Sequence, residues 1–297
     1  MVDLRPQDLP RLRDDLVQFG QTDIGAAMFS LVEQVETWSG NADTAHATAE
    51  SMTQALQLAD ATLFYVTPEM CELVDVAART LPEFAMSPDD PPSQVGLAWL
   101  ARPICDVTMD VPPRTLAANA TSWITTGGTV RLSQHLERDT LPIERRIRDE
   151  LPGLGFPVVF PMGAWDAPLD EQGMPVAVSN GATRHILAAI KTLWLLLRQP
   201  MTEQEEVVLP RPVRRRLARE GKEPPPVRVI RLRRPPAGRS GEPGEPVQWH
   251  HRWIVRGHWR QQPFGPGRGL RRPVWISPFV KGPEDAPLIG GEKVHLL

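Results

Sequence analysis

Apolar residues recur every three or four positions through much of the first eighty residues, which is the spacing of helices with one buried face. This spacing occurs at 8–19, 24–38 and 42–59. A short β-type run follows at 61–66, and Thr67-Pro68 is typical of the start of another helix, over 68–79. The pattern predicts a helical N-terminal region over residues 1–60.

From about residue 95 the pattern changes to short runs of β-forming residues. These runs cover 95–101, 121–132 and 156–160, and Gly127-Gly128 inside the second run is a hairpin signal. The stretch 182–198 is apolar around nearly its whole circumference, which favours a helix buried inside the fold. We therefore expect an α+β core over residues 61–199.

The sequence WHHRWIVRGHWR, residues 249–260, alternates with a period of two, as a strand does. One face carries the tryptophans and the other carries the arginines. Together with 227–234 and 274–281, the stretch 247–260 is expected to form an antiparallel meander, with a long hairpin loop at 261–273. A basic, proline-rich connector at 200–226 precedes this module, which spans 227–297, and is expected to hold a helical turn or two near Arg214–Arg219.

These elements predict an α+β fold with three parts. They are the helical N-terminal part, a central mixed β-sheet with a buried helix, and the C-terminal antiparallel β meander. Of the chain's 297 residues, 41 % are hydrophobic, which is enough to supply a core.

Charge divides the chain into two unlike parts although its formal net charge is only −3. Residues 1–210 hold 14 basic and 29 acidic residues, whereas residues 211–297 hold 19 basic and 7 acidic ones. A basic C-terminal third is typical of a protein that binds phosphate backbones. The alternative is internal, because the acidic part can neutralise the basic part within the fold.

The arginine face of the strip is the candidate nucleic-acid site. Guanidinium groups offer paired donors to phosphate oxygens, and such a cationic surface repels itself unless an anion or an acidic partner meets it. The residues expected to contact nucleic acid are Arg252, Arg256, Arg260, Arg268, Arg271 and Arg272.

The tryptophans on the other face favour a role in the core over base stacking, because an indole buries a large apolar area. The four concerned are Trp249, Trp253, Trp259 and Trp275.

Catalysis is a second hypothesis for the same cluster. Metal-independent ribonucleases need a base, an acid and a cation that stabilises phosphorane charge, and histidine with arginine or lysine supplies all three. The candidate catalytic residues are His258, Arg256, His250 and Lys281. On an ideal strand His250 and His258 lie roughly 26 Å apart, so they share one phosphate only if the strand bends, and Gly257 is a candidate for a bulge.

Other chemistry has little support in the sequence. Cys71 and Cys105, the two cysteines, make neither a disulfide framework nor a zinc site alone and are expected to be buried free thiols. No phosphate loop, nucleophile elbow or dinucleotide fingerprint occurs, so we expect no metal and no cofactor. The apolar run 186–197 is too short for a bilayer, and no signal peptide is recognisable, so a cytoplasmic location is expected.

Two C-terminal stretches, HRWIVRGHWR at 251–260 and VWISPFVKGPEDAPL at 274–288, resemble a family of actinobacterial and actinophage proteins. The stretches VTPEMCELVDVAARTLPEF and GLAWLARPI, and LLLRQP before VRVIRLRR, are also similar to that family, so the resemblance covers roughly residues 60–297. It implies an actinobacterial or phage context and no particular activity.

Three functions follow as hypotheses. The first is binding of RNA or DNA through the arginine face. The second is a metal-independent ribonuclease of the toxin–antitoxin or phage-defence kind. The third is a structural or regulatory protein whose basic face holds an acidic protein partner.

Overall fold

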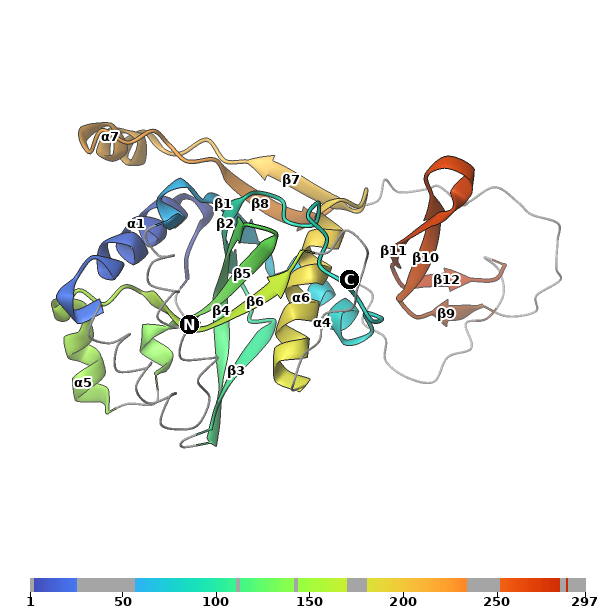
Figure 1. Cartoon of the computed structure of the whole chain (residues 1–297), viewed down its shortest axis with the longest axis horizontal. Helices are drawn as coiled ribbons and strands as arrows, with labels where there is room; N and C mark the ends of the chain where they lie inside the picture. Colours follow the sequence, from blue (N-terminus) through green and yellow to red (C-terminus); the bar gives the residue numbers. More distant parts are fainter. Residues whose placement is uncertain are drawn as a thin grey trace.

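The computed structural model describes residues 3–25, 57–110, 113–141, 144–169, 181–233, 252–283 and 287. Within them, eight strands form one mixed sheet, with helices packed on both of its faces (Figure 1). The predicted α+β class is confirmed. The helix expected at 24–38 and most of the one at 42–59 lie outside the described residues.

The strands of the large sheet are β1 (Thr62–Val66), β2 (Val95–Leu100), β3 (Cys105–Asp110), β4 (Pro113–Thr126), β5 (Thr129–Glu137), β6 (Val159–Pro168), β7 (Thr202–Glu206) and β8 (Val227–Leu232). The helices are α1 (Leu9–Gly20), α4 (Pro68–Arg79), α5 (Arg145–Glu150), α6 (Gly181–Leu197) and α7 (Arg211–Arg219). Short 3-10 turns are η1 (Pro6–Asp8), η2 (Leu58–Asp60), η3 (Arg138–Thr140), η4 (Leu151–Leu154) and η5 (Pro266–Arg268). The C-terminal strands are β9 (Trp253–Val255), β10 (His258–Phe264), β11 (Leu270–Ile276) and β12 (Phe279–Lys281).

The strand order is β6-β5-β4-β2-β1-β8-β7, and β3 pairs with the first part of β4. Strand β1 is parallel to both β2 and β8, whereas the other pairs are antiparallel. The hairpin between β4 and β5 turns at Gly127 and Gly128, as predicted. Both glycines have positive φ, 55° and 80°, which the tight turn requires.

Alternate residues of the central strands enter two cores on opposite faces of the sheet. Phe64 and Val66 of β1 pack with α4 and α6, whereas Leu63 of the same strand packs with α1. This two-sided burial explains why these strands are almost continuously apolar. Helices α4 and α6 begin and end within one or two residues of the positions that the apolar spacing predicted.

The contact between Trp123 and Gly96 joins the sheet to α6. The two residues are direct cross-strand partners on β4 and β2, and a Cβ atom on Gly96 would lie 2.2 Å from the indole. Trp123 also packs against Phe64 and Trp194, with ring centroids 5.3 and 5.5 Å apart. Its Nε1 donates a hydrogen bond to the Ser93 carbonyl at 3.0 Å. The indole therefore needs a residue without a side chain beneath it.

Lys191, which interrupts the apolar sequence of α6, is buried and forms an ion pair with the buried carboxylate of Asp90. Burial lowers the pKa of Lys191, and the neighbouring Asp90 opposes that shift. The backbone N–H of Ser87 also donates to Asp90. The pair therefore fastens the loop before β2 onto the helix.

The expectation that 227–234 is the first strand of the C-terminal meander is wrong. This segment is β8, which lies between β1 and β7 in the large sheet. Val227 is buried in the core on the α1 side and Ile230 in the core on the α6 side. A strand with apolar groups on both faces is stable only with both faces covered, and a central position in the sheet provides this.

Residues 252–283, the part of the module after β8 that the structure describes, form one bent hairpin. Pairing runs in one continuous register, from Phe264 opposite Leu270 to Trp253 opposite Lys281. It is interrupted where Arg256-Gly257 faces Ser277-Pro278, and Figure 1 shows β9 and β12 turned away from the direction of β10 and β11. Pro278 has no N–H to donate to the ladder, and the indole of Trp275 fills the space where Gly257 would carry a Cβ.

We predict that Gly96→Ala lowers the free energy of unfolding by about 2 kcal/mol, because the new methyl group overlaps the Trp123 indole. Chemical denaturation of both proteins measures the difference. The control is Gly153→Ala, where a Cβ meets no atom within 4 Å, and we expect a change within about 0.5 kcal/mol. Equal effects of the two substitutions would contradict the prediction.

Candidate nucleic-acid interface

Two tryptophans anchor the hairpin on the helical side of the protein. Trp275 is buried, at 3 % exposure, and Trp259 is half-buried against the same core. The Nε1 of Trp259 donates a hydrogen bond of 2.9 Å to the carbonyl of Ala77 in α4. The two indoles meet edge to face with centroids 5.3 Å apart. The predicted core role is confirmed for both, while Trp249 and the side chain of Trp253 lie outside the description.

The opposite face of β10 and β11 is open to solvent, and we call it the outward face. Its members are His258, Arg260, Gln262 and Phe264 of β10 and their cross-strand partners Ile276, Val274, Arg272 and Leu270 of β11. Gln262, Val274 and Ile276 are half-buried, and the other five are exposed. Along 255–260 the side chains alternate between half-buried and exposed, so the predicted two-sided pattern is confirmed there. The face is therefore held outward by the anchoring of the indoles on the other side.

Arg272 lies at the centre of this face. It is paired with Gln262, so Arg260 and Phe264 are its two diagonal neighbours, at roughly 7–8 Å in an antiparallel ladder. The guanidinium of Arg272 lies over the Phe264 ring, 5.3 Å from its centroid. Two guanidinium groups and an exposed aromatic ring are thus contiguous.

The expected loop 261–273 is shorter than predicted, because β10 continues to Phe264 and β11 begins at Leu270. Arg271 and Arg272 consequently lie on a strand, and strict alternation directs them to opposite faces. Arg268 lies in the remaining turn with φ of 57°, and its carbonyl accepts a hydrogen bond from Arg271 Nη1 at 2.6 Å. Arg271 is therefore turned toward the loop backbone and away from the outward face.

Residues 252–283 contain six arginines, one lysine and no acidic residue. Arg260, Arg268 and Arg272 form no ion pair with any carboxylate in the described part of the chain. Arg252, Arg256 and Lys281 each already have an interaction partner, so they are not counted among the open cations.

Internal neutralisation does occur, but elsewhere in the basic part of the chain. Arg231 pairs with Glu205, and Arg216 and Lys222 pair with Asp14. Internal pairing therefore holds for Arg216, Lys222 and Arg231 and not for the three open hairpin arginines.

The four candidate catalytic residues are not gathered at one point. His258 is exposed, and its Nδ1 lies 3.1 Å from the Arg256 carbonyl, so a proton on Nδ1 leaves Nε2 free to accept one. Lys281 is paired with Trp253, five positions along the ladder from His258 and on the other side of the bend. His250 lies outside the described residues.

A second histidine is buried in the sheet. His135 of β5 is 2 % exposed, and its Nε2 lies 2.9 Å from the Ser122 hydroxyl on β4. Burial lowers the pKa of His135 to about 3. Neither residue is accessible to a substrate, so the pair belongs to the core.

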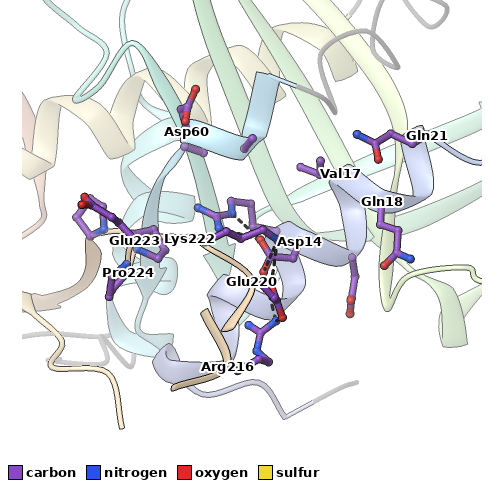
Figure 2. A pocket seen from close by; sticks show the side chains of 16 residues that line it. Asp14, Val17, Gln18, Gln21, Asp60, Arg216, Glu220, Lys222, Glu223 and Pro224 are labelled. Atoms are coloured by element: carbon purple, nitrogen blue, oxygen red, sulfur yellow. Dashed lines mark hydrogen bonds and ion pairs between the residues drawn. The ribbon is translucent and has the colours of Figure 1, made fainter. Parts of the chain in front are cut away.

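A cavity of about 850 Å³ lies between α1, η2 and the segment that follows α7 (Figure 2). Its central carboxylate is Asp14, which accepts hydrogen bonds from Arg13 at 2.8 Å and Arg216 at 3.4 Å and forms an ion pair with Lys222 at 3.5 Å. Burial, partly offset by Arg11, raises the pKa of the neighbouring Asp15. The charges around Asp14 hold α7 and its following segment against α1.

No group of three potential ligands that could hold a metal ion occurs among the described residues. Cys71 is a buried free thiol whose pKa is raised to about 12 by burial, as expected for an inert cysteine. The side chain of Cys105 is not described.

No model of a known protein family matches the chain, and a search of curated proteins finds no match. Among the described helices, none combines the length and the apolar character needed to cross a membrane.

Phe264, which lies on the outward face, was not among the site residues predicted from the sequence. The signal was present, because Phe264 follows Arg260 by four residues and continues the same period of two. The stretch 261–273 was interpreted as a loop because of its glycines and prolines. The predicted strand therefore ended at residue 260, before Phe264.

We predict that His135 contributes stability at neutral pH that is lost in acid. The folded protein holds this histidine neutral down to a pKa of about 3, whereas the unfolded chain protonates it near 6.5. Stability should therefore decrease as the pH falls from 6.5 toward 3, by about 1.4 kcal/mol per pH unit from this group. Urea unfolding between pH 7 and 4 should show a weaker pH dependence for His135→Gln, and identical slopes for the two proteins would refute the assignment.

Proposed function

We propose that this protein binds single-stranded nucleic acid through the outward face of its C-terminal hairpin. Phosphates would be held by Arg260, Arg272 and, in the adjoining turn, Arg268, and a base would stack on Phe264. The observation that carries the proposal is this acid-free hairpin, in which two exposed guanidinium groups adjoin an exposed aromatic ring.

The chemistry of these groups supports this ligand over other anions. Guanidinium groups match the paired oxygens of phosphate, and every base has a face that an aromatic ring can stack upon. Because Trp259 and Trp275 pack against the core, the exposed ring of Phe264 is the stacking candidate on this face. Bases are accessible for stacking only in unpaired strands, which favours a single-stranded ligand.

The test is a salt titration of oligonucleotide binding followed by fluorescence anisotropy. We predict that Arg260→Gln, Arg268→Gln and Arg272→Gln together reduce the slope of log K against log salt by about 2, since each phosphate contact in a single strand contributes about 0.7.

The matched control removes three arginines that already have carboxylate partners at i−4 or i+4, namely Arg79, Arg145 and Arg146. We expect this variant to keep the wild-type slope. An equal loss in both variants, or no binding by the wild type at low salt, would overturn the proposal. If the wild type bound no oligonucleotide at low salt but the hairpin captured an acidic protein, these results would support the interaction-protein hypothesis instead.

Metal-independent RNA cleavage is a second candidate, favoured by one observation. His258 stands on the outward face between Arg256 and Arg260, with Nδ1 positioned to donate to a backbone carbonyl and Nε2 facing away from that contact. A neutral imidazole in this orientation can accept a proton from a ribose 2′-hydroxyl group.

For this candidate we predict that RNA incubated with the wild type and a chelator is cleaved, and that His258→Gln abolishes cleavage while RNA binding changes less than twofold. Denaturing gels and anisotropy measure the two properties. Intact RNA after incubation with the wild type would exclude cleavage and leave the binding proposal standing.

A further inference from the structure

Helix α7 carries a second cationic surface, distant in the sequence from the hairpin. Its nine residues include five arginines, and four of these are exposed. We call these four the α7 arginines: Arg211, Arg214, Arg215 and Arg219. None of them forms an ion pair with a carboxylate of the described residues.

The helix is fixed in place by its other side. Leu217 is completely buried in the core beneath α1, and Val213 packs against the same core. Arg216, the fifth arginine, turns inward and pairs with Asp14 and Glu220. The α7 arginines are therefore displayed by a helix whose orientation is set by apolar and ionic contacts on its inner side.

The unpaired cations of α7 repel one another. Arg211, Arg215 and Arg219 follow at intervals of four residues, which stacks them along one side of the helix at about 6 Å per step. Like charges at this spacing destabilise a helix unless anions lie between them. A phosphate backbone supplies a row of such anions. Only the inner side of α7 is buried, so the row of arginines is accessible to it.

We propose that α7 is a second site for the phosphate backbone of nucleic acid, separate from the hairpin. The proposal rests on the proposed function for its ligand class. Helix α7 and the β10–β11 hairpin lie at opposite ends of the long axis of the molecule (Figure 1). A short oligonucleotide on one surface therefore does not reach the other, and one chain should bind two short strands.

The experiment measures stoichiometry by native mass spectrometry and calorimetry with an eight-nucleotide oligothymidine at low salt. Three full-length proteins are compared with the wild type. The first carries Arg211→Gln, Arg215→Gln and Arg219→Gln, the second is the hairpin triple variant, and the third is the control with Arg79, Arg145 and Arg146 replaced by Gln. Circular dichroism checks that α7 and the sheet are retained.

We expect two oligonucleotides per wild-type chain, one for each of the two surface variants, and two for the control. One oligonucleotide on the wild type that is lost only in the hairpin variant would overturn the α7 site and leave the proposed function intact. Loss confined to the α7 variant would support α7 and overturn the hairpin proposal. No binding to any protein would overturn both.

Anionic vesicles provide the alternative occupant. If the α7 substitutions abolished binding to phosphatidylserine vesicles but left oligonucleotide stoichiometry at two, the surface would be a lipid site and the proposal would be wrong. Equal stoichiometry in the α7 variant and the wild type would reject the proposal in any case.

Discussion

The close contact of indole rings with glycine backbone decides how the layers of this protein meet. Trp123 lies against Gly96 in the large sheet and packs against Phe64 and Trp194. Because Trp194 belongs to α6, these ring contacts join the sheet to the helix. The same arrangement recurs in the hairpin, where Trp275 occupies the space beside Gly257. In both places the close packing of the ring leaves no room for a side chain on the opposing residue. The hairpin itself is held on the helices by Trp275, which is buried in the core with α4 and α6, and by the hydrogen bond from Trp259 to Ala77.

Anchoring by tryptophan also explains the separation of charge on the hairpin. Because Trp259 and Trp275 face the helices, strand alternation turns Arg260 and Arg272 toward solvent. In α7 a buried Leu217 and the inward pair of Arg216 with Asp14 have the same effect on the remaining arginines. In both places the residues that hold the element in the fold determine which cations stay exposed. Some basic residues of the C-terminal third therefore form ion pairs that hold elements in place, and others remain exposed on the surface.

Much of the local structure could be predicted from the sequence. Apolar spacing located α1, α4 and α6, and the Gly127-Gly128 pair located the β4–β5 turn. The two-sided character of residues 255–260 was also readable, because alternation is a local property of a strand. The site predicted from the sequence was incomplete for two reasons. Phe264 was assigned to a loop, and the arginines of α7 were assigned to a connector.

The sequence by itself determined the α+β class, the helices and strands with strong periodicity, and the opposite placement of indoles and guanidinium groups, since each depends on neighbours a few residues apart. Only the tertiary structure decided that β8 belongs between β1 and β7, because this depends on which distant faces cover Val227 and Ile230. It also decided which cations are neutralised. Asp14 and Arg216 are about two hundred positions apart in the chain. A contact between residues so distant in sequence cannot be predicted from a local pattern.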